Sequence, residues 1–273
     1  MYYIYKDKKL FYQTIGSGQA ALFIHGRGCD HLLMKNAFEP IFQDKNYKRY
    51  YLDLPGMGKS DHPNGIYSSE AILEVLEGFV RDVILKDNDQ FLILAQSYGA
   101  YLARGLLAKM SQKVAGMFLL CPGILAMKED RTLPIYHEKT IDENFLKTLK
   151  QEEKEAYLPM AVQVNQETFD RWLSDIKVGL DSFDKRRLKE FIHNYSFTYD
   201  VDDIIKKLNY QGPVSFLMGR YDNVVGYQDA FTILDHYKRA SFQVVDQAGH
   251  YLQFEQVSIF NQSVENWLSS FDF

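Results

Sequence analysis

Short runs of hydrophobic residues alternate with stretches of helical periodicity along the first half of the chain. Each run has the length expected of a strand that is buried on both faces of a sheet. The strand-like runs cover residues 20–24, 49–53, 91–95 and 115–120. The helical stretches between them lie near residues 31–45, 68–86 and 98–111. Strands that alternate with helices of this length predict βαβ units, and therefore a largely parallel sheet.

Both ends of the chain extend this pattern. Alternating runs at residues 2–5 and 10–15, joined by a polar turn, predict an N-terminal hairpin. Towards the C-terminus, strand-like runs and helical stretches alternate again, over residues 213–218, 227–238, 241–245 and 254–269. The α/β pattern is therefore present on both sides of a central segment.

The central segment, residues 123–208, differs in composition from the rest. Within it, 31 of the 81 residues from 128 to 208 are charged, against 36 of the other 192. Its apolar residues recur with helical spacing, as in Phe145, Leu146 and Leu149. We therefore predict a helical insertion over residues 123–208, and a core formed by residues 1–122 and 209–273.

The composition of the chain is that of a globular protein. Of its 273 residues, 46% are hydrophobic and 25% are charged, which excludes a disordered, tail-like chain. A net charge of −5 without a basic block argues against nucleic acids and anionic membranes as main partners. Aromatic residues reach 15%, which indicates either a large aromatic core or an apolar substrate pocket.

The cysteines and the N-terminal residues indicate the cellular compartment in which the protein is expected. Two cysteines, Cys29 and Cys121, suggest free thiols in a reducing compartment. The N-terminus lacks a basic start followed by an apolar stretch, so we predict no signal peptide. The longest apolar run, residues 117–127, is too short to span a bilayer. We therefore expect a cytoplasmic protein.

One serine lies at a predicted junction between a strand and a helix, in Ala95-Gln96-Ser97-Tyr98-Gly99. A sharp turn of this kind strains the central residue and lifts its side chain out of the sheet. The turn needs small residues two positions before and after the serine, which Ala95 and Gly99 supply. The helix N-terminus beyond Ser97 favours a developing negative charge. Ser97 is therefore a candidate nucleophile, although capping the helix is the alternative role for a serine.

A serine nucleophile needs a base, and the base needs an acid that orients it. His250 lies between the last strand-like run and the last helical stretch. Asp222 follows the run at 213–218, although an aspartate there could also serve only to form a turn. Parallel strands bring their carboxyl ends to one edge of a sheet, where Ser97 also lies. We therefore predict Ser97, Asp222 and His250 as nucleophile, acid and base.

The negative charge formed by nucleophilic attack on a carbonyl needs two backbone N–H donors. We assign one to Tyr98, directly after the nucleophile. The other is Arg27, in the His25-Gly26-Arg27-Gly28 loop that follows the strand-like run at 20–24. The side chain of Arg27 either meets an acidic group of the substrate or is solvated.

These motifs, together with Asp53-Leu-Pro-Gly-Met-Gly-Lys-Ser60, resemble the α/β-hydrolase superfamily over essentially the whole chain. The resemblance implies an α/β-hydrolase fold, with a mostly parallel eight-stranded sheet flanked by helices. It also implies that residues 123–208 form a helical cap over the pocket, and Ser97, Asp222 and His250 match the triad positions of the family. A serine nucleophile, in place of aspartate, argues against the epoxide-hydrolase and haloalkane-dehalogenase branches.

The triad predicts a serine hydrolase that cleaves an acyl substrate, most simply a carboxylic ester, through an acyl-enzyme. Carbon–carbon bond hydrolysis and aminopeptidase activity are alternatives within the family. Acyl transfer to an acceptor other than water and ligand binding without catalysis are further alternatives. We expect a small-molecule substrate, no cofactor and no metal, since no His, Cys and carboxylate spacing indicates a metal site. Trp172 either contacts the substrate or packs within the insertion.

Overall fold

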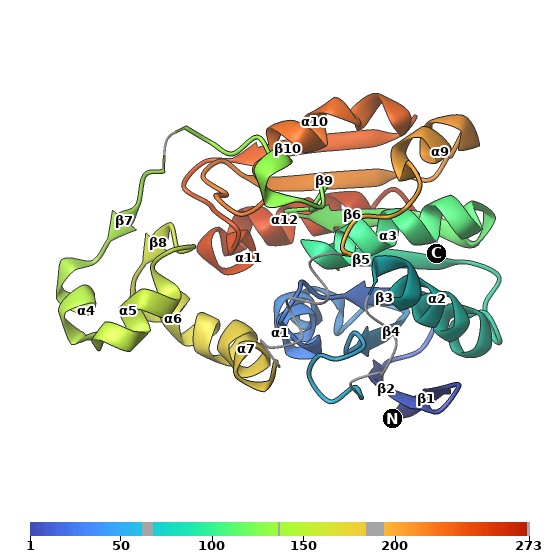
Figure 1. The fold of residues 1–273 in the computed structure, drawn as a ribbon, viewed down its shortest axis with the longest axis horizontal. Coiled ribbons are helices and arrows are strands. Elements are labelled where there is room, and N and C mark those ends of the chain that lie inside the picture. Colours follow the sequence, from blue (N-terminus) through green and yellow to red (C-terminus); the bar gives the residue numbers. More distant parts are fainter. Residues whose placement is uncertain (62–67, 136, 184–193, 272–273) are drawn as a thin grey trace.

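A sheet of eight strands forms the centre of the molecule (Figure 1). The structure, a computed structural model, describes residues 1–61, 68–135, 137–183 and 194–271. In spatial order the strands are β1 (Tyr2–Tyr5), β2 (Lys8–Ile15), β4 (Tyr47–Leu52), β3 (Gln19–Ile24), β5 (Phe91–Gln96), β6 (Val114–Leu120), β9 (Val214–Gly219) and β10 (Ala240–Val245). Only the β1–β2 and β2–β4 pairs are antiparallel. The predicted hairpin and the predicted mostly parallel sheet are both confirmed.

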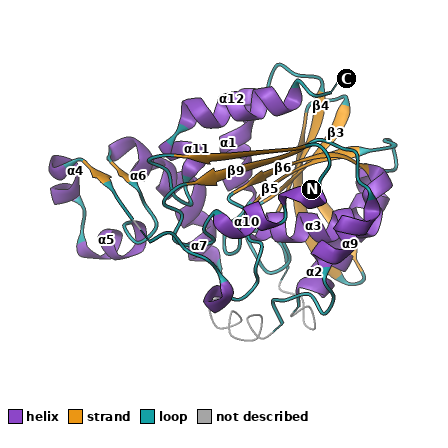
Figure 2. Ribbon diagram, turned by 90° about the horizontal axis from the view of Figure 1, so that it is seen from above, coloured by secondary structure: helices purple, strands orange, loops and turns teal. Residues whose placement is uncertain are grey.

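Helices cover both faces of the sheet (Figure 2). One face carries α1 (His31–Phe42), α11 (Leu252–Glu255) and α12 (Val257–Leu268). The other face carries α2 (Ser69–Phe79), α3 (Tyr98–Met110), α9 (Val201–Leu208) and α10 (Gln228–Thr232). The helix predicted near 227–238 is shorter than expected, since α10 gives way to a 3₁₀ turn at Leu234–His236. No helix among the described residues is both long and apolar enough to cross a membrane.

The two helical layers explain why the central strands β3 and β5 are hydrophobic at all but one position each. Successive side chains of a strand point to opposite faces. In β3, Phe23 packs with Phe38 of α1 in one cluster, whereas Leu22 and Ile24 belong to the cluster that contains α2 and α3. Every side chain of β5 is buried for the same reason.

The segment after β6 leaves the sheet and forms a small helical unit (Figure 1). Its elements are β7 (Thr140–Ile141), α4 (Glu143–Thr148), α5 (Gln151–Tyr157), β8 (Gln163–Val164), α6 (Gln166–Trp172), a π-helical turn (Leu173–Lys177) and α7 (Val178–Ser182). The Asn36 side chain of α1 donates a 2.8 Å hydrogen bond to Asp175 in the π-helical turn. The last helix of the predicted insertion, α9, instead packs beside α3. The limits of the insertion at 123 and 208 stay a prediction.

A partly buried ion pair attaches α9 to the core. Arg104 of α3 is fully buried, and its guanidinium donates to the Asp202 carboxylate in the first turn of α9. The same guanidinium donates to the carbonyl oxygens of Gly123 and Ile124, at 3.4 and 3.2 Å. A buried charge that loses its partner is strongly destabilising. Asp202 therefore stabilises the fold by compensating the charge of Arg104.

Neutralising this carboxylate should weaken the fold. We expect Asp202→Asn to lower the free energy of unfolding by about 2 kcal/mol, because Arg104 would be left buried without a counter-charge. Asp203→Asn is the matched control, since Asp203 is in the same helical turn and, among the described residues, its carboxylate pairs only with the exposed Lys207. That change should cost less than about 0.5 kcal/mol. Equal losses in urea unfolding of the two variants would contradict this account.

Candidate active site

Ser97 is held in a strained conformation between β5 and α3. Its backbone angles are φ 56° and ψ −117°, a region that residues other than glycine rarely adopt. The Ser97 N–H donates to the Leu120 carbonyl oxygen at 3.1 Å, and its own carbonyl oxygen accepts from the Gly123 N–H at 3.0 Å. Hydrogen bonds on both sides fix the backbone, so the strain is maintained by the surrounding structure.

Two glycines allow the backbones around Ser97 to come together. A Cβ atom on Gly99 would collide with the Ile24 and His25 carbonyl oxygens at the end of β3. A Cβ atom on Gly26 would collide with the side-chain oxygen of Gln96. The start of α3 and the loop after β3 therefore meet at Ser97, as the small-residue pattern predicts.

The side chains of Ser97, His250 and Asp222 form a continuous hydrogen-bonded chain. His250 Nε2 lies 2.9 Å from Ser97 Oγ, and His250 Nδ1 lies 2.8 Å from Asp222 Oδ2. The other oxygen of Asp222 accepts hydrogen bonds from the N–H groups of Val224 and Val225, at 2.8 and 3.0 Å. Both Asp222 oxygens thus act as acceptors, so Nδ1 of His250 carries the proton and Nε2 accepts from the Ser97 hydroxyl.

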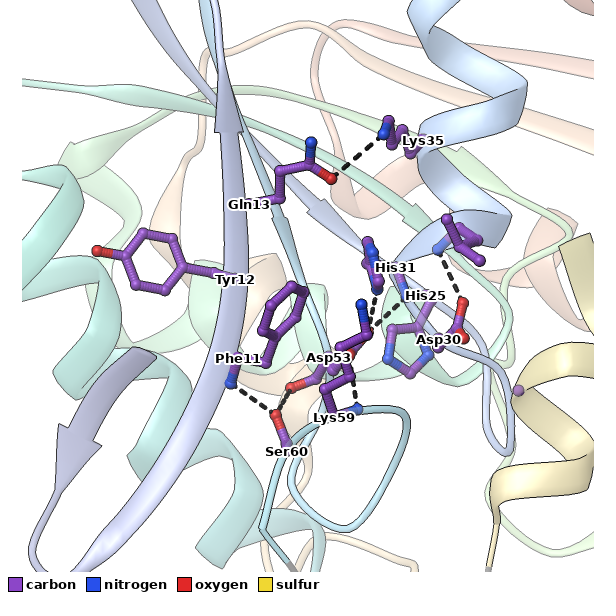
Figure 3. A network of polar contacts seen from close by, with 12 residues as sticks. Phe11, Tyr12, Gln13, His25, Asp30, His31, Lys35, Asp53, Lys59 and Ser60 are labelled. Atoms are coloured by element: carbon purple, nitrogen blue, oxygen red, sulfur yellow. Dashed lines mark hydrogen bonds and ion pairs between the residues drawn. The ribbon is translucent and has the colours of Figure 1, made fainter. Parts of the chain in front are cut away.

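A polar network around Asp53 fixes the loop after β4 (Figure 3). Asp53 Oδ1 accepts from the N–H and the Nδ1 of His31, at 2.6 and 2.8 Å, and Oδ2 accepts from the Lys59 N–H at 2.8 Å. The Ser60 hydroxyl donates to the Asp53 carbonyl oxygen at 2.6 Å and accepts from the Phe11 N–H at 2.9 Å. Burial raises the pKa of Asp53, but the His31 hydrogen bond and the nearby histidines lower it overall. Asp53 therefore joins the loop after β4 to the start of α1.

The same loop supports the segment that contains Arg27. The Leu54 N–H donates to His25 Nε2 at 2.9 Å, and the Gly28 N–H donates to Met57 Sδ at 3.3 Å. Burial lowers the pKa of His25, so the ring stays neutral and accepts at Nε2. The backbone around Arg27 is therefore held on both sides. The other predicted oxyanion donor, Tyr98, is the first residue of α3.

A cavity of about 320 Å³ opens beside Ser97 and His250. The core lines it with Gly26, Arg27, Gly28, Cys29, Gln96, Ser97, Val224, Val225, His250 and Tyr251. The segment after β6 lines it with Gly123, Arg131, Met160, Ile176, Leu180, Phe183 and Tyr195. Trp172 is not among these residues: it is buried with Tyr157 and Phe169, and its indole donates to the Tyr251 hydroxyl at 3.2 Å. Trp172 thus packs within the insertion, behind a residue that lines the cavity.

A buried carboxylate, Glu255, connects the insertion to the histidine loop. Its Oε1 accepts from the Val162 and Gln163 N–H groups, at 2.6 and 3.3 Å, and its Oε2 accepts from the Gly249 N–H at 2.7 Å. Gly249 directly precedes His250. Burial raises the pKa of Glu255 to about 7, against the lowering effect of the three N–H donors. Glu255 therefore positions both the histidine loop and the entry to β8.

Two groups of described residues have potential metal-ligating atoms close together. They are Cys121 with Asp222 and His250, and Asp30 with His31 and Asp53. Hydrogen bonds already engage the oxygens of Asp222 and Asp53, and Asp30 caps α1 by accepting from the Leu32 N–H. Hydrogen bonding alone is therefore enough to explain why the side chains in each group lie close together. The absence of a metal stays a prediction.

Comparison with known proteins identifies the family of the chain. A family model described as "Serine aminopeptidase, S33" matches residues 17–257. An alpha/beta superfamily hydrolase from Oenococcus oeni PSU-1 has a structure that aligns with a TM-score of 0.89 and 30% sequence identity, over 98% of both chains. The chain belongs to the α/β-hydrolase superfamily. No relative was found among curated proteins.

Other solved structures share the fold of this α/β hydrolase at lower identity. An esterase from Exiguobacterium antarcticum aligns with a TM-score of 0.73 and 16% identity over 96% of each chain. A meta-cleavage product hydrolase from Pseudomonas fluorescens IP01 aligns with a TM-score of 0.67 and 20% identity, over 97% of this chain and 95% of that one. At such identities the likeness shows the fold alone.

The site of this hydrolase also contains residues that the sequence did not single out. Arg131, Tyr195 and Glu255 come from segments without a motif, and only the folded chain brings them to the cavity or to the histidine loop. One signal was available: Glu255 is an acidic residue directly after Tyr251-Leu-Gln-Phe254, in which three of the four residues are apolar. Such a residue is buried only when it is well paired.

The raised pKa of Glu255 makes stability depend on pH. The folded protein binds this proton more tightly than the unfolded chain, so the contribution of Glu255 to the free energy of unfolding falls as pH rises from about 4.5 to about 7. We expect Glu255→Gln to reduce this fall, because the group no longer titrates. Urea unfolding of wild type and variant at pH 5 and pH 8 measures the effect. Glu265→Gln, on the exposed side of α12, is the control.

The pH dependence of the control should match that of wild type. If Glu255→Gln also showed the wild-type fall in stability between pH 5 and pH 8, the account of Glu255 would be wrong.

Proposed function

We propose that this protein is a serine hydrolase that cleaves a carboxylic ester through an acyl-enzyme. The observation that carries the proposal is the hydrogen-bonded chain from Ser97 through His250 to Asp222, with Ser97 and His250 at the wall of a cavity. A serine used only as a helix cap needs neither partner. The strained turn at Ser97 supports the same assignment, because such strain is typical of nucleophiles on this fold.

In the proposed reaction, His250 Nε2 takes the proton of Ser97 Oγ while Oγ attacks the carbonyl carbon of the ester. The carbonyl oxygen becomes negatively charged and accepts hydrogen bonds from the Arg27 and Tyr98 N–H groups. His250 then gives its proton to the leaving alcohol. A water molecule then gives a proton to His250 and attacks the acyl-enzyme carbonyl. The carboxylic acid leaves, and Ser97 Oγ takes the proton back from His250. Asp222 holds the imidazole in the required tautomer and stabilises its cationic form.

The cavity wall favours an ester over an N-terminal peptide substrate. An aminopeptidase must bind an ammonium group, and a carboxylate is the usual partner for one. Among the described residues that line the cavity, none is aspartate or glutamate. Carbon–carbon bond hydrolysis, acyl transfer and ligand binding without catalysis are distinguished from ester hydrolysis by product analysis.

We further propose that residues 123–208 act as a cap and that the protein works in the cytoplasm. The cap is supported by Met160, Ile176 and Leu180, which come from the insertion and line the cavity. The location is supported by Cys29 and Cys121, which are both free thiols.

Removing the nucleophile tests the proposal. We expect Ser97→Ala to lower kcat/KM for 4-nitrophenyl acetate by at least about 10⁴-fold, because the remaining groups cannot form an acyl-enzyme. Thermal unfolding and circular dichroism should show an intact fold. Ser258→Ala, an exposed serine of α12, is the matched control and should retain wild-type turnover. Turnover by Ser97→Ala close to that of wild type would refute the assignment.

A further inference from the structure

Two arginines line the cavity beside the nucleophile, and neither pairs with a carboxylate among the described residues. They are Arg27, in the loop after β3, and Arg131, in the segment that follows β6. The whole chain carries a net charge of −5, so the charge of these two cavity residues is opposite in sign to the net charge of the protein. Arg131 is half-buried, and an uncompensated cation in such a place is costly unless a ligand completes it.

Arg131 has a fixed orientation. Its Nε, Nη1 and Nη2 atoms donate to the carbonyl oxygens of Leu125, Val224 and Ala126, at 2.9, 2.9 and 2.7 Å. Carbonyl dipoles hold the guanidinium in place, but no carboxylate in the described part of the chain pairs with its charge. Arg131 is therefore a fixed positive charge at the cavity wall.

Arg27 lies near the same point but has more freedom. Its side chain is exposed, and its guanidinium carbon lies 5.3 Å from the centre of the Tyr195 ring. Burial raises the pKa of Tyr195 to about 12, and the charges of both Arg27 and Arg131 lower it. Both guanidinium groups therefore act on one tyrosine of the cavity wall.

The apolar remainder of the cavity wall strengthens the attraction of these two charges for an anion. Much of the cavity surface is apolar, with Met160, Ile176, Leu180, Phe183 and Val225 among the lining residues. Charges interact more strongly beside apolar walls than in open water. The guanidinium fork also matches the planar geometry of a carboxylate.

We propose that Arg27 and Arg131 form a carboxylate-binding site in the cavity, so that the substrate is a small ester that also carries a carboxylate. This inference rests on the proposed ester hydrolysis and names its substrate class. The cavity of about 320 Å³ limits the substrate to a compact molecule.

A pair of esters that differ only in charge tests the inference. Monomethyl adipate and methyl hexanoate have acyl chains of the same length, and one ends in a carboxylate where the other ends in a methyl group. We expect wild-type kcat/KM, measured by proton release, to favour the monoanion at least tenfold. The ratio should fall as ionic strength rises, because Arg27 is exposed.

Arg27→Gln should reduce this ratio at least fivefold. The ratio is the readout because the Arg27 backbone is part of the proposed oxyanion hole, and a general loss of turnover cancels between the two esters. Arg81→Gln is the matched control, since Arg81 is an exposed arginine paired with Glu77 and does not line the cavity. An equal fall in both variants would overturn the inference, because the preference would then come from overall charge.

A binding measurement separates failure of the inference from failure of the proposed function. In Ser97→Ala, titration calorimetry should show the monoanion binding at least tenfold more tightly than the neutral ester. Wild-type hydrolysis of both esters with a ratio near one would overturn the carboxylate site and leave the hydrolase proposal standing. Selective binding of the monoanion without any wild-type hydrolysis would support the site and overturn ester hydrolysis.

Discussion

The close approach of α3 to the end of β3 is the constraint on which the proposed catalytic site depends. Gly99 lets the first turn of α3 touch the Ile24 and His25 carbonyl oxygens, where any side chain would collide. Ser97 lies two residues before Gly99, takes a positive φ, and lines the cavity. The same contact brings the Tyr98 backbone and the loop of Arg27 to one point. The proposed nucleophile and the two proposed oxyanion donors thus lie around one close contact.

Strand order supplies the partners of Ser97. β9 and β10 are parallel neighbours, and their carboxyl ends meet so closely that a Cβ on Gly219 would collide with the carbonyl oxygens of Ala248 and Gly249. The loops that follow contain Asp222 and His250, which therefore face each other across a short gap. Glu255 ties the His250 loop to the insertion through backbone N–H groups. The insertion, which lines the cavity, is thus linked through Glu255 to the backbone next to His250.

The features of the fold and of the candidate site that depend on local sequence pattern and on strand direction could be predicted from the sequence. Continuous apolar runs mark strands that are buried on both faces, so β3 and β5 were predicted within one residue of their observed ends. The predicted Ser97, Asp222 and His250 lie together because parallel strands end at one edge. Trp172 shows the limit: its spacing fits a helix, but whether that face meets the cavity or the core of the insertion depends on tertiary packing. Arg131 and Tyr195 line the cavity, but the hydrophobic periodicity of their segments does not predict this position.

The central claim is that the folded protein activates one serine. Labelling with a fluorophosphonate probe, followed by intact-mass and peptide mass spectrometry, measures this directly, since only an activated serine reacts rapidly. The account predicts a single adduct, located on Ser97, that does not form on protein unfolded in urea. An adduct on a different residue, or no adduct on folded protein, would contradict it.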